Sequence, residues 1–92
     1  MQYNALLTID LPHSAGKKRD SFYRSLEKNK WEKIAFLSTA WSRSFQAIRE
    51  QQDVEKRIIQ HLKEAKKDSG LIVVSVAFQI GTEEVRKTGF ML

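Results

Sequence analysis

The order in which two kinds of apolar periodicity follow one another is the strongest constraint on how this chain folds. Apolar and polar residues alternate from Tyr3 to Asp10, which predicts a half-buried strand that ends before Pro12. Elsewhere the apolar residues recur at three- and four-residue steps, which is typical of a helix with one buried face. Read along the chain, the periods predict strand, helix, strand, strand, helix and strand.

Two segments have the helical spacing. The first follows Ser14-Ala15-Gly16, ends near Asn29 and carries a short apolar stripe made of Phe22, Tyr23 and Leu26. The second has lysines late in its length and acidic residues early, which suits the helix dipole, and Gly70 follows it as a left-handed stop. Its stripe is the longest in the chain: Val54, Ile58, Ile59, Leu62 and Ala65.

Three further segments have strand character. We expect strands over 32–37 and 41–45, joined tightly at Ser38-Thr39, and a last main strand over the β-branched run 71–80. After a charged stretch, the residues 90–92 are apolar and predict either a short terminal strand or a segment that docks on a partner subunit.

These elements predict an α+β fold, a ferredoxin-like sandwich with two helices on one face of a four-stranded antiparallel sheet. The order β-α-β-β-α-β is that of two split βαβ units with right-handed crossovers. Merging 31–46 into one bent strand would instead leave three strands. Because the chain has 92 residues and neither a linker nor an internal repeat, we expect a single domain over 1–92.

Several classes of protein are excluded by composition. The chain has no Cys, so it has no disulfide, no thiolate zinc site and no cysteine nucleophile. Its amino terminus lacks a basic leader with a long apolar run, and no stretch approaches the roughly 18 apolar residues that cross a bilayer. We expect no membrane insertion and a cytoplasmic location.

The net charge of +5 is unevenly distributed. Residues 1–49 hold nine Lys or Arg against four acidic residues, whereas residues 50–92 hold seven of each. Clustered cations reinforce one another within a Debye length of about 10 Å, so this asymmetry favours an anionic partner such as RNA or DNA.

Lys17-Lys18-Arg19 place three cations where the first helix should begin. Cations are disfavoured at the positive end of a helix dipole, and a bound phosphate would relieve the conflict. Alternatively, the helix starts later with Asp20 as its cap, which leaves three solvated loop cations.

Asp10 and His13 are the candidate catalytic residues. A carboxylate at the end of a strand, three residues before an imidazole, is suited to general acid–base chemistry. Asp10 is also an ordinary turn residue, and one Asp with one His falls short of a metal site, so we expect no metal and no cofactor. We expect His61 to be a surface or core-boundary residue of the second helix and not a ligand.

Trp41, Arg43 and Phe45 share one side of an inner strand. On an open sheet face the rings would stack on bases and Arg43 would contact phosphate, whereas on the face beneath the helices the rings would pack in the core. Core packing is the favoured interpretation. The predicted nucleic-acid contacts are Lys17, Lys18, Arg19, Arg24, Arg43 and Arg49.

The segment Leu6-Leu7-Thr8-Ile9-Asp10-Leu11-Pro12-His13-Ser14, followed by an amphipathic helix and an aromatic hairpin, resembles the type V antitoxin GhoS family. That family is similar to the CRISPR-associated second protein, a small dimeric subunit of spacer acquisition with nuclease members. The resemblance covers residues 3–46. It implies a homodimer that contacts RNA or DNA through basic residues such as Arg19 and Arg24, and phosphodiester cleavage with Asp10 at the dimer cleft.

We therefore expect a small nucleic-acid-binding domain that regulates or cleaves RNA. The alternative is a non-enzymatic assembly module that dimerises through its edge strands and its carboxyl-terminal tail. A domain that binds a small ligand is a third interpretation, although a thin core leaves little room for a cavity.

Overall fold

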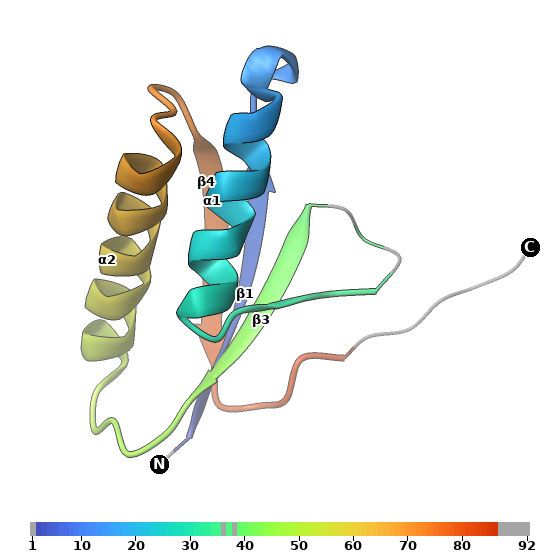
Figure 1. Cartoon of the computed structure of the whole chain (residues 1–92). Coiled ribbons are helices and arrows are strands. Elements are labelled where there is room, and N and C mark those ends of the chain that lie inside the picture. Colours follow the sequence, from blue (N-terminus) through green and yellow to red (C-terminus); the bar gives the residue numbers. More distant parts are fainter. Residues whose placement is uncertain (1, 36, 38, 87–92) are drawn as a thin grey trace, which may run out of the picture.

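The computed structural model describes residues 2–35, 37 and 39–86. Its two long helices are α1 and α2, and a short 3-10 turn, His13–Ala15, precedes α1 (Figure 1). In chain order the elements are β1 (Tyr3–Asp10), α1 (Lys17–Lys28), β2 (Glu32–Lys33), β3 (Ala40–Phe45), α2 (Gln51–Ser69) and β4 (Ser75–Gly81). The predicted tail 90–92 lies outside the described residues.

The four strands form one antiparallel sheet in the order β2-β3-β1-β4. β1 lies in the middle, with Leu7 opposite both Trp41 of β3 and Phe78 of β4. Both helices cover the same face of the sheet (Figure 1). The ferredoxin-like sandwich is thus confirmed, and the three-stranded alternative is wrong, because β2 and β3 are separate strands that pair with each other.

The core lies between the sheet and the helices. Alternate residues of β1, namely Ala5, Leu7 and Ile9, are buried against the helices, and Trp41 and Phe45 of β3 lie on the same side. The helices contribute most of their predicted apolar stripes, including Phe22, Leu26, Val54 and Ile58, whereas Ile59 is exposed. Burial of each large apolar side chain is worth about 1.5–3 kcal/mol, so this layer is the main source of stability.

Two strands are shorter than their sequence predicts. β2 ends at Lys33 rather than Leu37, because the chain turns there: the amide of Leu37 donates to the carbonyl of Ile34 at 3.1 Å. β4 begins at Ser75 rather than Leu71. Ser75 is opposite Asp10, the last residue of β1, so earlier residues have no neighbouring strand to pair with.

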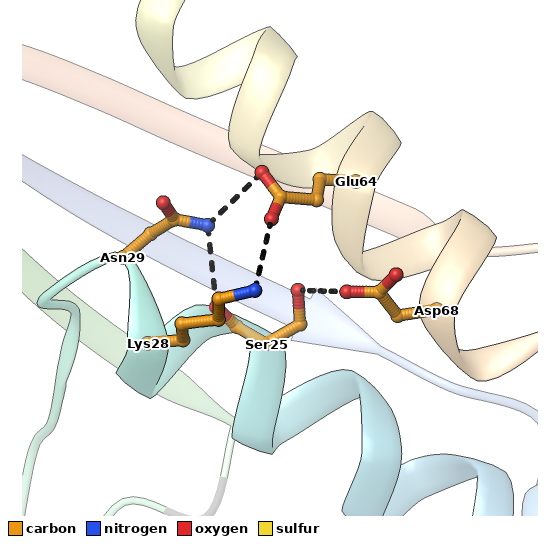
Figure 2. Close-up of polar contacts among 5 residues, drawn as sticks. All are labelled: Ser25, Lys28, Asn29, Glu64 and Asp68. Atoms are coloured by element: carbon orange, nitrogen blue, oxygen red, sulfur yellow. Dashed lines mark hydrogen bonds and ion pairs between the residues drawn. The ribbon is translucent and has the colours of Figure 1, made fainter.

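A row of polar contacts joins α1 to α2 (Figure 2). The Ser25 hydroxyl donates to Asp68 Oδ2 at 3.1 Å, and the Asn29 amide donates to Glu64 Oε2 at 3.4 Å. Lys28 Nζ lies 3.9 Å from Glu64 Oε1. These contacts align the two helices along their common side.

The segment that follows β4 crosses the face of the sheet that carries no helix. The Asn4 side chain donates to the carbonyl of Glu83 at 2.9 Å, and Val85 lines the same hollow as Ser42 and Ser44 of β3. This crossing explains why Asn4 and Ser42 are only 7% exposed on a face that is otherwise open. The described part of the chain therefore leaves β4 on the side of β1 and β3, away from its own outer edge.

Candidate nucleic-acid interface

The first turn of α1 contains the three predicted cations. The helix begins at Lys17, directly after Gly16, whose φ of 54° and ψ of −125° suit glycine. No side chain caps this end of the helix. The alternative in which Asp20 is the cap is wrong, because Asp20 itself lies within the first turn.

No carboxylate of the described residues forms a salt bridge with these cations, although Asp20 lies in the same turn. Lys17 and Lys18 are exposed, while Arg19 is half-buried and its guanidinium donates to the carbonyl of Pro12 at 3.4 Å. Within residues 2–35, 37 and 39–86 the one salt bridge is between Lys28 and Glu64, at the other end of the helix. At the start of a helix, the unpaired backbone N–H groups and the positive end of the helix dipole reinforce the positive charge of these side chains. The turn is therefore electropositive.

Asp10 and His13 lie on the connection between β1 and this turn. Both side chains are exposed, and Asp10 borders a shallow hollow of about 380 Å³ together with Thr39 and Ser75. In the described part of the chain no hydrogen bond joins the two side chains. The structure thus brings a carboxylate and an imidazole to the end of the sheet where α1 begins, without pairing them.

Arg24 extends the same surface along α1. It is exposed and follows Lys17 by seven residues, so the two lie on one side of the helix about 10 Å apart along its axis. A nucleic-acid strand that contacted the first turn would reach Arg24 without leaving the helix.

Arg43 lies elsewhere and faces the helices. Its Nε donates to the carbonyl of Asn29 at 2.8 Å, at the carboxyl end of α1, and its guanidinium lies 4.1 Å from the centre of the Phe45 ring. Partial burial and the neighbouring charge of Arg57 lower the pKa of Arg43. Trp41 and Phe45 are buried beside it, which confirms the interpretation of these rings as core. Arg43 is therefore not on the open face of the sheet.

Arg49 is also remote from the first turn of α1. It is exposed in the connection from β3 to α2, and its carbonyl accepts a hydrogen bond of 3.2 Å from the hydroxyl of Tyr3, the first residue of β1. Asp10 and α1's first turn lie at the opposite end of β1. The six predicted contacts thus divide into two groups, with Lys17, Lys18, Arg19 and Arg24 on α1 and the other two near the opposite end of the sheet.

A polar contact that the sequence did not predict joins α2 to the core. The indole of Trp31 donates to Nδ1 of His61 at 3.1 Å, and the His61 ring stacks on Phe45 at 6.3 Å. Burial, followed by the charge of Arg43, lowers the pKa of His61, although Glu64 acts in the opposite direction. His61 is therefore a half-buried boundary residue, as expected. Its partner is 30 positions away, which no local sequence signal reveals.

Among the described residues no group of three His, Asp or Glu side chains is placed to hold a metal ion. No helix in that part of the chain is long and apolar enough to cross a membrane.

Comparison with known proteins bears on the fold alone. No family model matches the sequence, and no curated protein matches it either. The structure is similar to that of protein SP2199 from Streptococcus pneumoniae, with a TM-score of 0.57 and 11% sequence identity over 92% of this chain and 90% of that one. At this identity the similarity supports the α+β sandwich and carries no information on activity.

Proposed function

We propose that this protein binds nucleic acid, and that the first turn of α1 holds a backbone phosphate. The observation that supports the proposal is the placement of Lys17, Lys18 and Arg19 in an uncapped first turn with no carboxylate within salt-bridge distance among the described residues. When no anion is bound, each cation at this end of the helix dipole costs a few tenths of a kcal/mol. An anion bound at the turn would convert this repulsion into attraction.

Single-stranded RNA is the polyanion in this proposal, because its backbone phosphates can follow the exposed side of one helix. Arg24 would contact a second phosphate along the same side of α1. Arg43 and Arg49 have no part in this surface, because they lie near the other end of the sheet.

The test is a salt series of binding to a short single-stranded RNA. Replacing Lys17, Lys18 and Arg19 with Gln should weaken binding and lower the slope of log affinity against log salt by about 0.7, the value for the one phosphate that the turn would hold. The matched control replaces three exposed lysines of α2, Lys56, Lys63 and Lys67, with Gln, which removes the same charge elsewhere. Equal losses in both triple variants would show that only net charge matters and would refute the site.

Cleavage of the bound strand is proposed as a further step at the same end of the molecule. Asp10 and His13 are exposed there, on the connection that leads into the first turn of α1. Asp10 would act as a general base and His13 as a general acid. Asp10→Asn should abolish cleavage and leave RNA affinity intact, whereas cutting that persists in this variant would exclude Asp10 from the chemistry.

A further inference from the structure

The outer edge of β4 is the least protected edge in the described structure. β4 is the last strand in the sheet order, so one of its sides pairs with β1 and the other has no strand beside it. The run from Leu71 to Gly81 contains no charged residue and no proline. Natural sheets usually protect such an edge with charges, proline or very short strands. The opposite edge does so, because β2 has only two residues and both are charged.

Exposed apolar side chains gather along this edge. Ile72 is 83% exposed and Val73 is 63% exposed, just before the strand, and Val76 within it is 41% exposed. Ile59 of α2, the helix that contacts β4, is 39% exposed. Four of the five large apolar side chains that are exposed in the described structure therefore belong to this region. A concentration of this kind marks an interaction surface.

The described chain does not cover this edge itself. After Gly81 the segment turns under the sheet towards β1 and β3, where Glu83 contacts Asn4 (Figure 1). Within residues 39–86 the outer edge of β4 is thus left without a neighbouring strand.

The pattern of β4 is complementary to itself. Val76, Phe78 and Ile80 lie on the helix side of the sheet, and Ser75, Ala77, Gln79 and Gly81 lie on the other side, as the pairing with β1 requires. An antiparallel copy of the strand, centred on Phe78, would place Val76 opposite Ile80 of the second copy and Ala77 opposite its Gln79. On the helix side apolar residues then meet apolar residues, and the helices of both copies lie on one face.

The neighbouring side of α2 has the charge pattern that the same symmetry needs. Glu55, Ile59 and Lys66 recur there at helical spacing, and Glu55 and Lys66 are exposed. Two antiparallel α2 helices that pair Glu55 of one copy with Lys66 of the other would have their centre between 60 and 61, with Ile59 of each copy close to it.

We propose that the protein is a homodimer formed by antiparallel pairing of two β4 strands, which joins the two sheets into one eight-stranded sheet. This inference does not depend on the proposed binding of nucleic acid. The occupant of the edge is a second copy because the strand pattern, the exposure of Val76 and Ile59, and the helix charge fit the same twofold arrangement.

The mass in solution tests the dimer. Sedimentation velocity of the whole chain should give twice the 10.7 kDa of one chain at micromolar concentration, without RNA. Val76→Lys should give a folded monomer, because it places a charge on the paired strand. Leu37→Lys is the matched control, since Leu37 is 52% exposed in the turn between β2 and β3, and it should remain dimeric. A monomeric wild type, or a folded Val76→Lys variant that stays dimeric, overturns the proposal.

Cross-linking tests the register and does not require a disruptive variant. The natural chain has no cysteine, so Ala77→Cys and Gln79→Cys introduce single thiols at exposed positions. A short bis-maleimide should link a mixture of the two variants more efficiently than a mixture of Ala77→Cys with Gln60→Cys on α2. Equal yields in the two mixtures would refute pairing centred on Phe78.

Discussion

His61 makes the stability of the fold depend on pH. Burial and the charge of Arg43 lower its pKa below the ordinary value of about 6.5, and the ring accepts a hydrogen bond from Trp31 only while Nδ1 is unprotonated. The unfolded chain therefore binds this proton more readily than the folded chain. The stabilising contribution is complete above about pH 6.5 and is lost as the pH falls towards the folded pKa.

We expect the free energy of unfolding, measured by urea denaturation, to fall as the pH decreases from about 7 to about 5. His61→Gln should remove most of this dependence. His13→Gln is the control, because His13 is the other histidine of the chain and is exposed. An unchanged pH dependence in His61→Gln would contradict the assignment.

Gly70 ends α2 in a left-handed conformation, with φ of 74°. An alanine there would meet no atom within 4 Å, so its cost is conformational and we expect Gly70→Ala to lower the free energy of unfolding by about 1–2 kcal/mol. Gly81→Ala also meets no atom within 4 Å, but Gly81 has no left-handed φ, so the change should stay within about 0.5 kcal/mol. Thermal or chemical denaturation distinguishes the two, and similar costs would contradict this explanation.

At the scale of elements, the contacts between α1 and α2 differ in strength. Ser25 is buried and donates to Asp68, so Ser25→Ala should cost about 1 kcal/mol of unfolding free energy. Lys28 is largely exposed and its Nζ lies 3.9 Å from the Glu64 carboxylate, so Lys28→Ala should cost less than about 0.5 kcal/mol. Urea denaturation of both variants checks the ranking, and a larger effect for Lys28→Ala would reverse it.

Periodicity correctly predicted the elements that bury one side against the core, because such burial requires apolar residues at regular spacing. β1 has the predicted bounds, and α2 contains its whole predicted stripe, since one side of each packs against the core. The lengths of β2 and β4 were wrong because a strand extends only as far as its neighbour does, and the neighbour of β4 ends at Asp10. Such limits depend on residues far away in the sequence.

The candidate site was predicted only in part for the same reason. The first turn of α1 was identified from local charge, and Arg43 was correctly grouped with Trp41 and Phe45. Core packing was correctly favoured for the two rings, but the sequence could not reveal the hydrogen-bond partner that Arg43 finds on that face. The bond from Arg43 to Asn29 depends on how β3 packs against α1.

At the scale of the molecule, the excess positive charge does not form one continuous surface. Lys17, Lys18, Arg19 and Arg24 lie on α1, while Arg43 and Arg49 lie near the far end of the sheet. An anionic strand is therefore expected to contact one end of the sandwich and one helix. If the β4 dimer forms, each copy contributes one such site.

Backbone amide NMR during a titration with short single-stranded RNA at low salt tests the central claim most directly, because it locates the contact without altering a residue. We expect the largest shifts at residues 16–20, with smaller ones near Arg24. Shifts confined to the surroundings of Arg43 and Arg49, or none at saturating RNA, would contradict a phosphate site at the first turn of α1.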